Sequence, residues 1–80
     1  MFKVMYTRRA VKALRKIPEP HRSRVQKAIN ELPEGDIKKL TGEPGYRLRV
    51  GNWRIIYDIE HDQLIIEVIN MGPRGKIYKH

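Results

Sequence analysis

The spacing of hydrophobic residues changes near the middle of the chain, and it predicts helices first and strands afterwards. Two stripes recur at intervals of three and four residues, which is typical of one face of a helix. The first stripe, within residues 8–17, is Ala10, Ala13, Leu14 and Ile17. The second stripe is Val25, Ala28, Ile29 and Leu32. Pro18 ends the first helix, Pro20 suits the first turn of the second, and Pro33 stops it. The two stripes therefore predict a helical hairpin.

Short strands are predicted on both sides of this hairpin. Residues 2–6, FKVMY, favour a strand, and the Thr7 hydroxyl can cap the first helix. Hydrophobic residues then alternate with polar ones from Tyr46 to Val50 and from Trp53 to Ile59, with a turn at Gly51 and Asn52. Residues 64–71, LIIEVINM, are hydrophobic on both faces, as in a central strand.

The segment between the second helix and these strands is rich in glycine and proline. Residues 33–45, PEGDIKKLTGEPG, are predicted to form a folded-down loop anchored by Ile37 and Leu40. The whole pattern predicts one α+β domain over residues 1–80: an N-terminal strand, a two-helix hairpin, and antiparallel strands of a single small sheet. The helices are expected to cover one face of that sheet.

If the helices cover the hydrophobic side of the strands, alternation sends Arg47, Arg49 and Arg54 to the opposite face. Like charges on adjacent strands are destabilising, so folding alone does not favour this set. Guanidinium groups bind phosphates through two parallel hydrogen bonds, which suits a nucleic-acid backbone. The alternative is that Arg47 and Arg49 are solvated positions of an edge strand.

The net charge supports a polyanionic partner. The chain has 17 Lys and Arg residues against 9 Asp and Glu residues, a formal net charge of +8. Nucleic acid, an acidic protein or an anionic membrane surface would each be attracted. The basic face of the first helix, from Arg8 to Lys16, is either a contributor to such binding or a solvated surface.

Compartment and cofactor follow from what the sequence lacks. It contains no cysteine, no signal peptide and no apolar run of about 18 residues, so a cytoplasmic protein that does not enter membranes is expected. The acidic residues and His61 in residues 58–62 fall at a predicted turn, where Asp is favoured for local reasons, so no metal or cofactor is predicted.

The C-terminal segment, MGPRGKIYKH, carries a second group of candidate residues. After Gly72 and Pro73, an extended chain would place Arg74, Lys76 and Tyr78 on one side. The alternative for Tyr78 is a packing aromatic residue of an edge strand.

Two stretches, KLTGEPGYRLRVGNWRIIYDI and VINMGPRGKIYK, resemble the RelE branch of the RelE/ParE superfamily of toxins from type II toxin–antitoxin systems. The resemblance runs over essentially the whole chain and implies a RelE-like, microbial RNase-like fold. It also implies a ribosome-dependent endoribonuclease that works without a metal. Such an enzyme binds the ribosome, including its 16S rRNA, and cuts mRNA in the A site. The mRNA's own 2′-hydroxyl attacks the adjacent phosphate. An antitoxin protein is the implied partner.

Site residues follow from the same resemblance. Arg54 matches an arginine that assists at the phosphate, Arg74 an arginine that stabilises the transition state, and Tyr78 a tyrosine that is either a base or a stacking residue. Arg47 and Arg49 match RNA-binding positions, and Lys76 is a further, less firmly matched, RNA-binding candidate. Two other functions stay open: a ParE-like, non-enzymatic inhibitor of DNA gyrase, and a non-toxic nucleic-acid-binding module.

Overall fold

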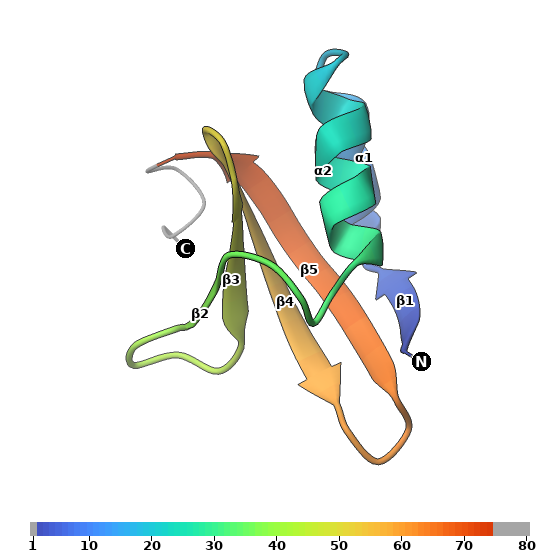
Figure 1. Cartoon of the computed structure of the whole chain (residues 1–80), viewed down its shortest axis with the longest axis vertical. Helices are drawn as coiled ribbons and strands as arrows, with labels where there is room; N and C mark the ends of the chain where they lie inside the picture. The colour runs from blue at the N-terminus through green and yellow to red at the C-terminus, as the bar shows by residue number, and fades with distance from the viewer. Residues whose placement is uncertain (1, 75–80) are drawn as a thin grey trace.

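A five-stranded mixed sheet with two helices forms the part of the chain described by the computed structural model, residues 2–74 (Figure 1). The elements are, in chain order, β1 (Lys3–Tyr6), α1 (Arg8–Arg15), α2 (His21–Asn30), β2 (Ile37–Lys39), β3 (Tyr46–Val50), β4 (Trp53–Glu60) and β5 (Ile65–Pro73). The strands lie in the order β1-β5-β4-β3-β2. β1 runs parallel to β5, and the other neighbours are antiparallel. The predicted α+β class is therefore confirmed.

Local side-chain contacts set where α1 begins. The Thr7 hydroxyl accepts a hydrogen bond from the Ala10 N–H at 3.1 Å, as predicted for a cap, and donates to the Ile69 carbonyl at 2.6 Å. The first bond satisfies an otherwise unpaired donor of the first turn, and the second ties α1 to β5. The helix ends at Arg15, two residues before the predicted Ile17.

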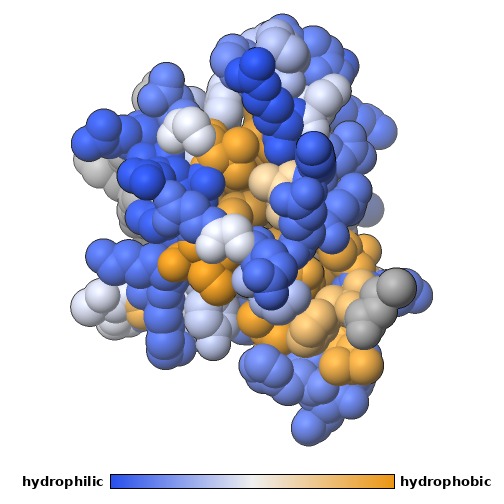
Figure 2. All heavy atoms as spheres, viewed as in Figure 1, coloured by the Kyte–Doolittle hydropathy of each residue, from blue (hydrophilic) through white to orange (hydrophobic). Residues whose placement is uncertain are grey.

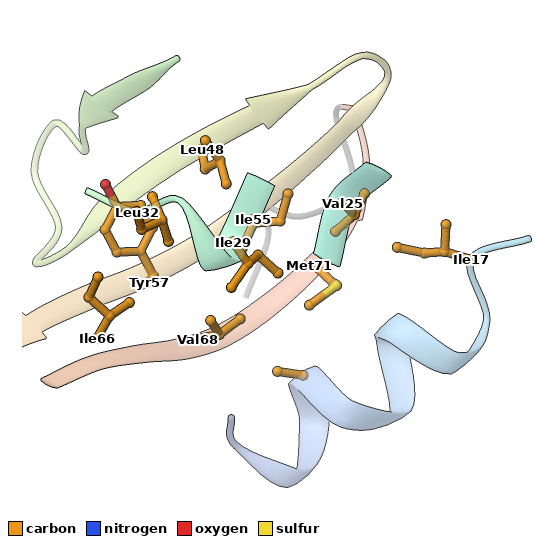
Figure 3. Close-up of a cluster of buried hydrophobic side chains, with 11 residues drawn as sticks. Ile17, Val25, Ile29, Leu32, Leu48, Ile55, Tyr57, Ile66, Val68 and Met71 are labelled. Atoms are coloured by element: carbon orange, nitrogen blue, oxygen red, sulfur yellow. The ribbon is translucent and has the colours of Figure 1, made fainter. Parts of the chain in front are cut away.

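The hydrophobic core lies between the two helices and one face of the sheet (Figure 3). All eight residues of the two predicted stripes are buried in this core or packed against it, and they meet the alternating residues of β3, β4 and β5. The buried hydrophobic residues are Ala10, Ile17, Val25, Ile29, Leu32, Leu48, Ile55, Tyr57, Ile66, Val68 and Met71. A core of this size stabilises the short chain mainly through burial of apolar surface.

The predicted loop over residues 33–45 is wrong in part, because it contains the edge strand β2. This strand pairs with β3, and Ile37 lies opposite Leu48. Ile37 thus shares the core-facing side of the sheet with Leu48, yet it is 38% exposed rather than an anchor. The outer strand contributes backbone hydrogen bonds here, not a core side chain.

A β-bulge between β4 and β5 changes which positions of β5 face the core. Ile55 pairs with Met71 and Ile56 with Asn70, but Tyr57 pairs with Val68, so Ile69 is the extra residue. An extra residue reverses the alternation of faces along one strand. As a result Met71 and Val68 both reach the core, although they are three residues apart.

The surface is mostly hydrophilic. In Figure 2, hydrophilic residues cover most of the visible face, and hydrophobic residues show in a band through its middle. Neither described helix has the length and apolar character that crossing a membrane requires.

Candidate nucleic-acid interface

The sheet face opposite the helices carries the predicted arginines in two rows that run across the strands. Arg47 on β3 lies between Lys38 on β2 and Ile56 on β4. In the next row, Arg49 on β3 lies opposite Arg54 on β4. Leu48 and Ile55, at the alternate positions, are buried in the core, so the arginines share the other face as predicted.

Arg54 lies on the predicted face, but it is buried there, because only 8% of it is exposed. Its Nη1 donates to the carbonyl oxygens of Gly51 at 2.8 Å and Trp53 at 3.0 Å. Buried charges require such partners, and a guanidinium has enough donors to keep others free. Arg54 is therefore fixed against the β3–β4 turn.

The same turn also holds the start of the C-terminal segment. The Arg74 backbone N–H donates to the Asn52 carbonyl at 2.8 Å, and Gly72 lies opposite Arg54 in the β4–β5 register. The Arg74 side chain is exposed. The turn at Gly51 and Asn52 is therefore bonded both by the Arg54 side chain and by the Arg74 backbone, from residues 20 positions apart in the sequence.

Arg47 and Arg49 share one carboxylate. Arg49 Nε donates to Asp36 Oδ2 at 2.6 Å, and Arg47 Nη2 lies 3.7 Å from Asp36 Oδ1. The Arg49 side chain is 54% exposed and that of Arg47 is 19% exposed. Arg47 Nε is buried and finds no hydrogen-bond partner among residues 2–74.

Lys76 and Tyr78 lie outside the described residues, so their predicted roles stay predictions. Tyr57 does not offer an alternative base. Burial, and secondly the neighbouring Tyr46, raises the pKa of Tyr57 to about 12, and its hydroxyl lies in the core side of the sheet. A phenol with that pKa stays protonated at neutral pH.

Sequence reasoning missed two residues of this face, Lys38 and Asp36. Both belong to the segment that was predicted to be a loop, and their positions depend on the pairing of β2 with β3. The alternation of Ile37 with Lys38 was the signal available, but a three-residue strand in a glycine-rich and proline-rich segment is too short to identify by period.

A groove of about 690 Å³ lies on the other side of the molecule, between α1 and the end of β5. It exists because β1 pairs with β5 only as far as Val68, so the remaining length of β5 faces α1 without a strand between them in the described structure. The groove is lined by basic residues of α1 and its end and by apolar residues of the sheet: Arg8, Arg9, Lys12, Lys16, Trp53, Met71 and Pro73.

Within residues 2–74, no group of three or more His, Asp or Glu side chains is arranged to hold a metal ion.

Comparison with known proteins identifies the family. A family model for the ParE toxin of the type II toxin–antitoxin system parDE matches residues 4–78. Toxin RelE3 of Methanocaldococcus jannaschii is 35% identical over 72 residues, which cover 79% of this chain and 82% of the relative.

Two solved archaeal complexes have the same fold as this chain. The RelB–RelE antitoxin–toxin complex from Methanococcus jannaschii matches with 30% identity and a TM-score of 0.75, over 92% of this chain and 94% of that chain. The RelE–RelB complex from Pyrococcus horikoshii OT3 matches with 27% identity and a TM-score of 0.76, over 94% of this chain and 97% of that chain. These matches confirm the resemblance drawn from the sequence. The chain belongs to the RelE/ParE family of toxins of type II toxin–antitoxin systems and is RelE-like.

Proposed function

We propose that this toxin is a metal-independent endoribonuclease that acts in the cytoplasm and cleaves mRNA in the A site of the ribosome. The observation that carries the proposal is the attachment of both Arg54 and Arg74 to the β3–β4 turn, Arg54 through its side chain and Arg74 through its backbone N–H, with Arg49 directly opposite Arg54. Three guanidinium groups, from β3, from β4 and from the residue that follows β5, are suited to an anionic substrate.

The chemistry needs charge stabilisation more than proton donation from these arginines. When the RNA 2′-hydroxyl attacks the adjacent phosphorus, a P–O bond forms to the ribose and the bond to the 5′-oxygen breaks. The leaving 5′-oxygen takes up a proton, in this proposal from water, so the products are a 2′,3′-cyclic phosphate and a 5′-hydroxyl end. Negative charge develops on the phosphoryl oxygens in the transition state, and fixed cations stabilise it. Arginine stays protonated, so this is the natural role of Arg54 and Arg74.

Removal of the 2′-hydroxyl proton requires another group, and Tyr78 is our candidate. A free tyrosine has a pKa near 10, so a phenolate at neutral pH would need a shift of roughly three units, which nearby cations favour. The other role for Tyr78 is stacking on the substrate base. Arg47, Arg49 and Lys76 are proposed to bind the RNA backbone, and Lys38 joins them because it lies opposite Arg47.

The proposed protein partner is a cognate antitoxin. The relatives from Methanococcus jannaschii and Pyrococcus horikoshii are RelE toxins in complex with RelB. On this chain, the groove beside α1 combines basic side chains with apolar ones, which suits an amphipathic segment with acidic residues. A neighbouring gene product that suppresses toxicity and co-purifies with the toxin would support this partner.

Mapping of new mRNA 5′ ends after induction tests the enzymatic proposal. Wild-type toxin should arrest growth and produce 5′-hydroxyl ends within translated codons, and Arg74→Ala should abolish both. Arg22→Ala is the matched control. It also removes one arginine, but Arg22 lies on α2, where it pairs with Glu19 at 3.3 Å, and the helices cover the other face of the sheet. Growth arrest with intact mRNA would contradict the proposal.

A second candidate function is inhibition of DNA gyrase without catalysis, because the matching family model is that of a ParE toxin. This function would produce a DNA-damage response without new mRNA ends. It would also be insensitive to Tyr78→Phe, since a binding protein needs no proton acceptor at that position.

A further inference from the structure

We propose that Asp36 is an internal competitor for RNA phosphate: its carboxylate takes the place between Arg47 and Arg49 that a phosphate group of the substrate would take. This inference rests on the proposed function, because it assumes that RNA is the ligand of the arginine face. In this proposal, Asp36 sets the affinity of the toxin for its RNA substrate.

The contacts of Asp36 are those of a bridging anion. Its Oδ2 accepts from Arg49 Nε at 2.6 Å, while its Oδ1 lies 3.7 Å from Arg47 Nη2. A phosphate presents the same chemistry, with oxygens that accept from two guanidinium groups at once. The carboxylate and a phosphate cannot both occupy these donors, so the two anions exclude each other.

The backbone holds Asp36 at this position. The Arg49 N–H donates to the Asp36 carbonyl at 2.9 Å, and the next residue, Ile37, pairs with Leu48 in the β2–β3 ladder. Gly35, with a φ of +128°, makes the turn that leads into β2. Asp36 therefore lies beside Arg49 because of the fold, and not only because of the attraction between side chains.

The ion pair between Asp36 and Arg49 is open to competition from solvent. The side chain of Asp36 is 46% exposed and that of Arg49 is 54% exposed. Exposed pairs of this kind contribute little to stability, so a multivalent polyanion can displace the carboxylate at low cost. Displacement would free cationic groups for the RNA, beside the fixed side chain of Arg54.

Binding of a single-stranded RNA oligonucleotide with 2′-O-methyl groups tests the proposal. The methyl groups block the attacking hydroxyl, so affinity is measured without cleavage. Asp36→Asn and Asp62→Asn are compared with wild type, because each raises the formal net charge from +8 to +9. Asp62 is exposed in the β4–β5 turn, at the end of the sheet opposite the β3–β4 turn (Figure 1).

We expect Asp36→Asn to bind the oligonucleotide about two- to fivefold more tightly than Asp62→Asn does. This range is the ratio of affinities that corresponds to the energy of one exposed ion pair. The slope of log K against log salt concentration should steepen by about 0.7, the value for one additional phosphate contact to a single strand. In an Arg49→Ala background, Asp36→Asn should lose most of its effect, because the two residues act as a pair.

Weaker binding by Asp36→Asn would overturn the proposal, since it would mean that the carboxylate positions the arginines for RNA. Equal affinity of Asp36→Asn and Asp62→Asn would also overturn it, because only net charge would then matter. Asp36→Ala removes the same ion pairs and is measured beside Asp36→Asn, with thermal unfolding of each variant, to separate binding from folding.

The outcome is distinguishable from the test of the proposed function. Tighter binding by Asp36→Asn together with intact mRNA after induction would contradict the endoribonuclease and leave the role of Asp36 standing. Normal mRNA cleavage without a specific effect of Asp36 would do the reverse. Absence of any oligonucleotide binding at low salt would overturn the role of Asp36.

Discussion

Arg49 on β3 and Arg54 on β4 lie directly opposite each other in the antiparallel register, although both carry a positive charge. The structure compensates the two charges differently. Arg49 pairs with the exposed carboxylate of Asp36, and Arg54 donates to the carbonyls of Gly51 and Trp53. One arginine of the pair is thus held rigidly in the fold, and the other is accessible to a ligand.

Arg54→Lys should lower both stability and activity. A lysine keeps the charge, but its ammonium is more strongly hydrated than a guanidinium and its shorter side chain does not place a donor where Nη1 bonds the two carbonyls. We therefore expect a loss of about 1–3 kcal/mol in the free energy of unfolding. Denaturant unfolding measures this loss, and mRNA 5′-end mapping measures activity. Arg49→Lys is the matched control and should cost less than about 1 kcal/mol, because its pair is exposed. Equal costs would show that burial of Arg54 does not matter.

Tyr57→Phe should leave the fold as stable as wild type or more stable at neutral pH. The Tyr57 hydroxyl is buried and has no hydrogen-bond partner among residues 2–74, and an unsatisfied buried polar group costs about 1–3 kcal/mol. Thermal unfolding of the two proteins checks this expectation. A loss of more than about 1 kcal/mol would indicate that the hydroxyl has a partner after all.

The same residue predicts a loss of stability at alkaline pH. The pKa of Tyr57 is raised to about 12 in the folded protein, so the unfolded chain, with a tyrosine pKa near 10, releases this proton first. The contribution of Tyr57 is therefore complete below pH of about 10 and is lost as pH rises toward about 12. The free energy of unfolding, measured from about pH 8 to about pH 12, should fall less steeply for Tyr57→Phe than for wild type. Parallel curves for both proteins would contradict the assignment.

Gly35→Ala should destabilise the fold by about 1–3 kcal/mol and disturb the position of Asp36. The φ of Gly35 is +128°, and an added Cβ would lie 3.1 Å from Leu48 Cδ1 in the core. Gly42→Ala is the matched control: its φ is also positive, at +74°, but the space around it is open. Denaturant unfolding should show the larger loss for Gly35→Ala, and the reverse order would contradict this account of the turn.

Charge reversal in the groove should weaken antitoxin binding. Lys12→Glu places a carboxylate among the basic residues that line the groove, and we expect affinity for an acidic antitoxin segment to fall about tenfold. Calorimetric titration with the purified antitoxin measures this change. Lys27→Glu makes the same charge change on the exposed surface of α2 and should have a smaller effect. Equal losses of affinity for the two variants would mean that the antitoxin binds elsewhere or that only the net charge of the toxin attracts it.

The sequence by itself determined the elements whose pattern is local. The spacing of Ala10, Ala13 and Leu14 determined a helix, because side chains three and four residues apart lie on the same side of it. Alternation around Leu48 and Ile55 determined the hairpin and placed the arginines on the face away from the core. The family resemblance came from the same stretch and is confirmed over residues 4–78.

Only the tertiary structure decided which distant segments became neighbours. The parallel pairing of β1 with β5, the edge strand β2, the bulge at Ile69 of β5, and the contact of Asp36 with Arg49 all depend on pairing between segments that no local pattern relates. The burial of Arg54 belongs to the same group, because alternation gives the face of a residue but not what covers it. The physical reason is that periodicity reports the direction of a side chain relative to its own strand or helix, while pairing and burial depend on the packing of the whole core.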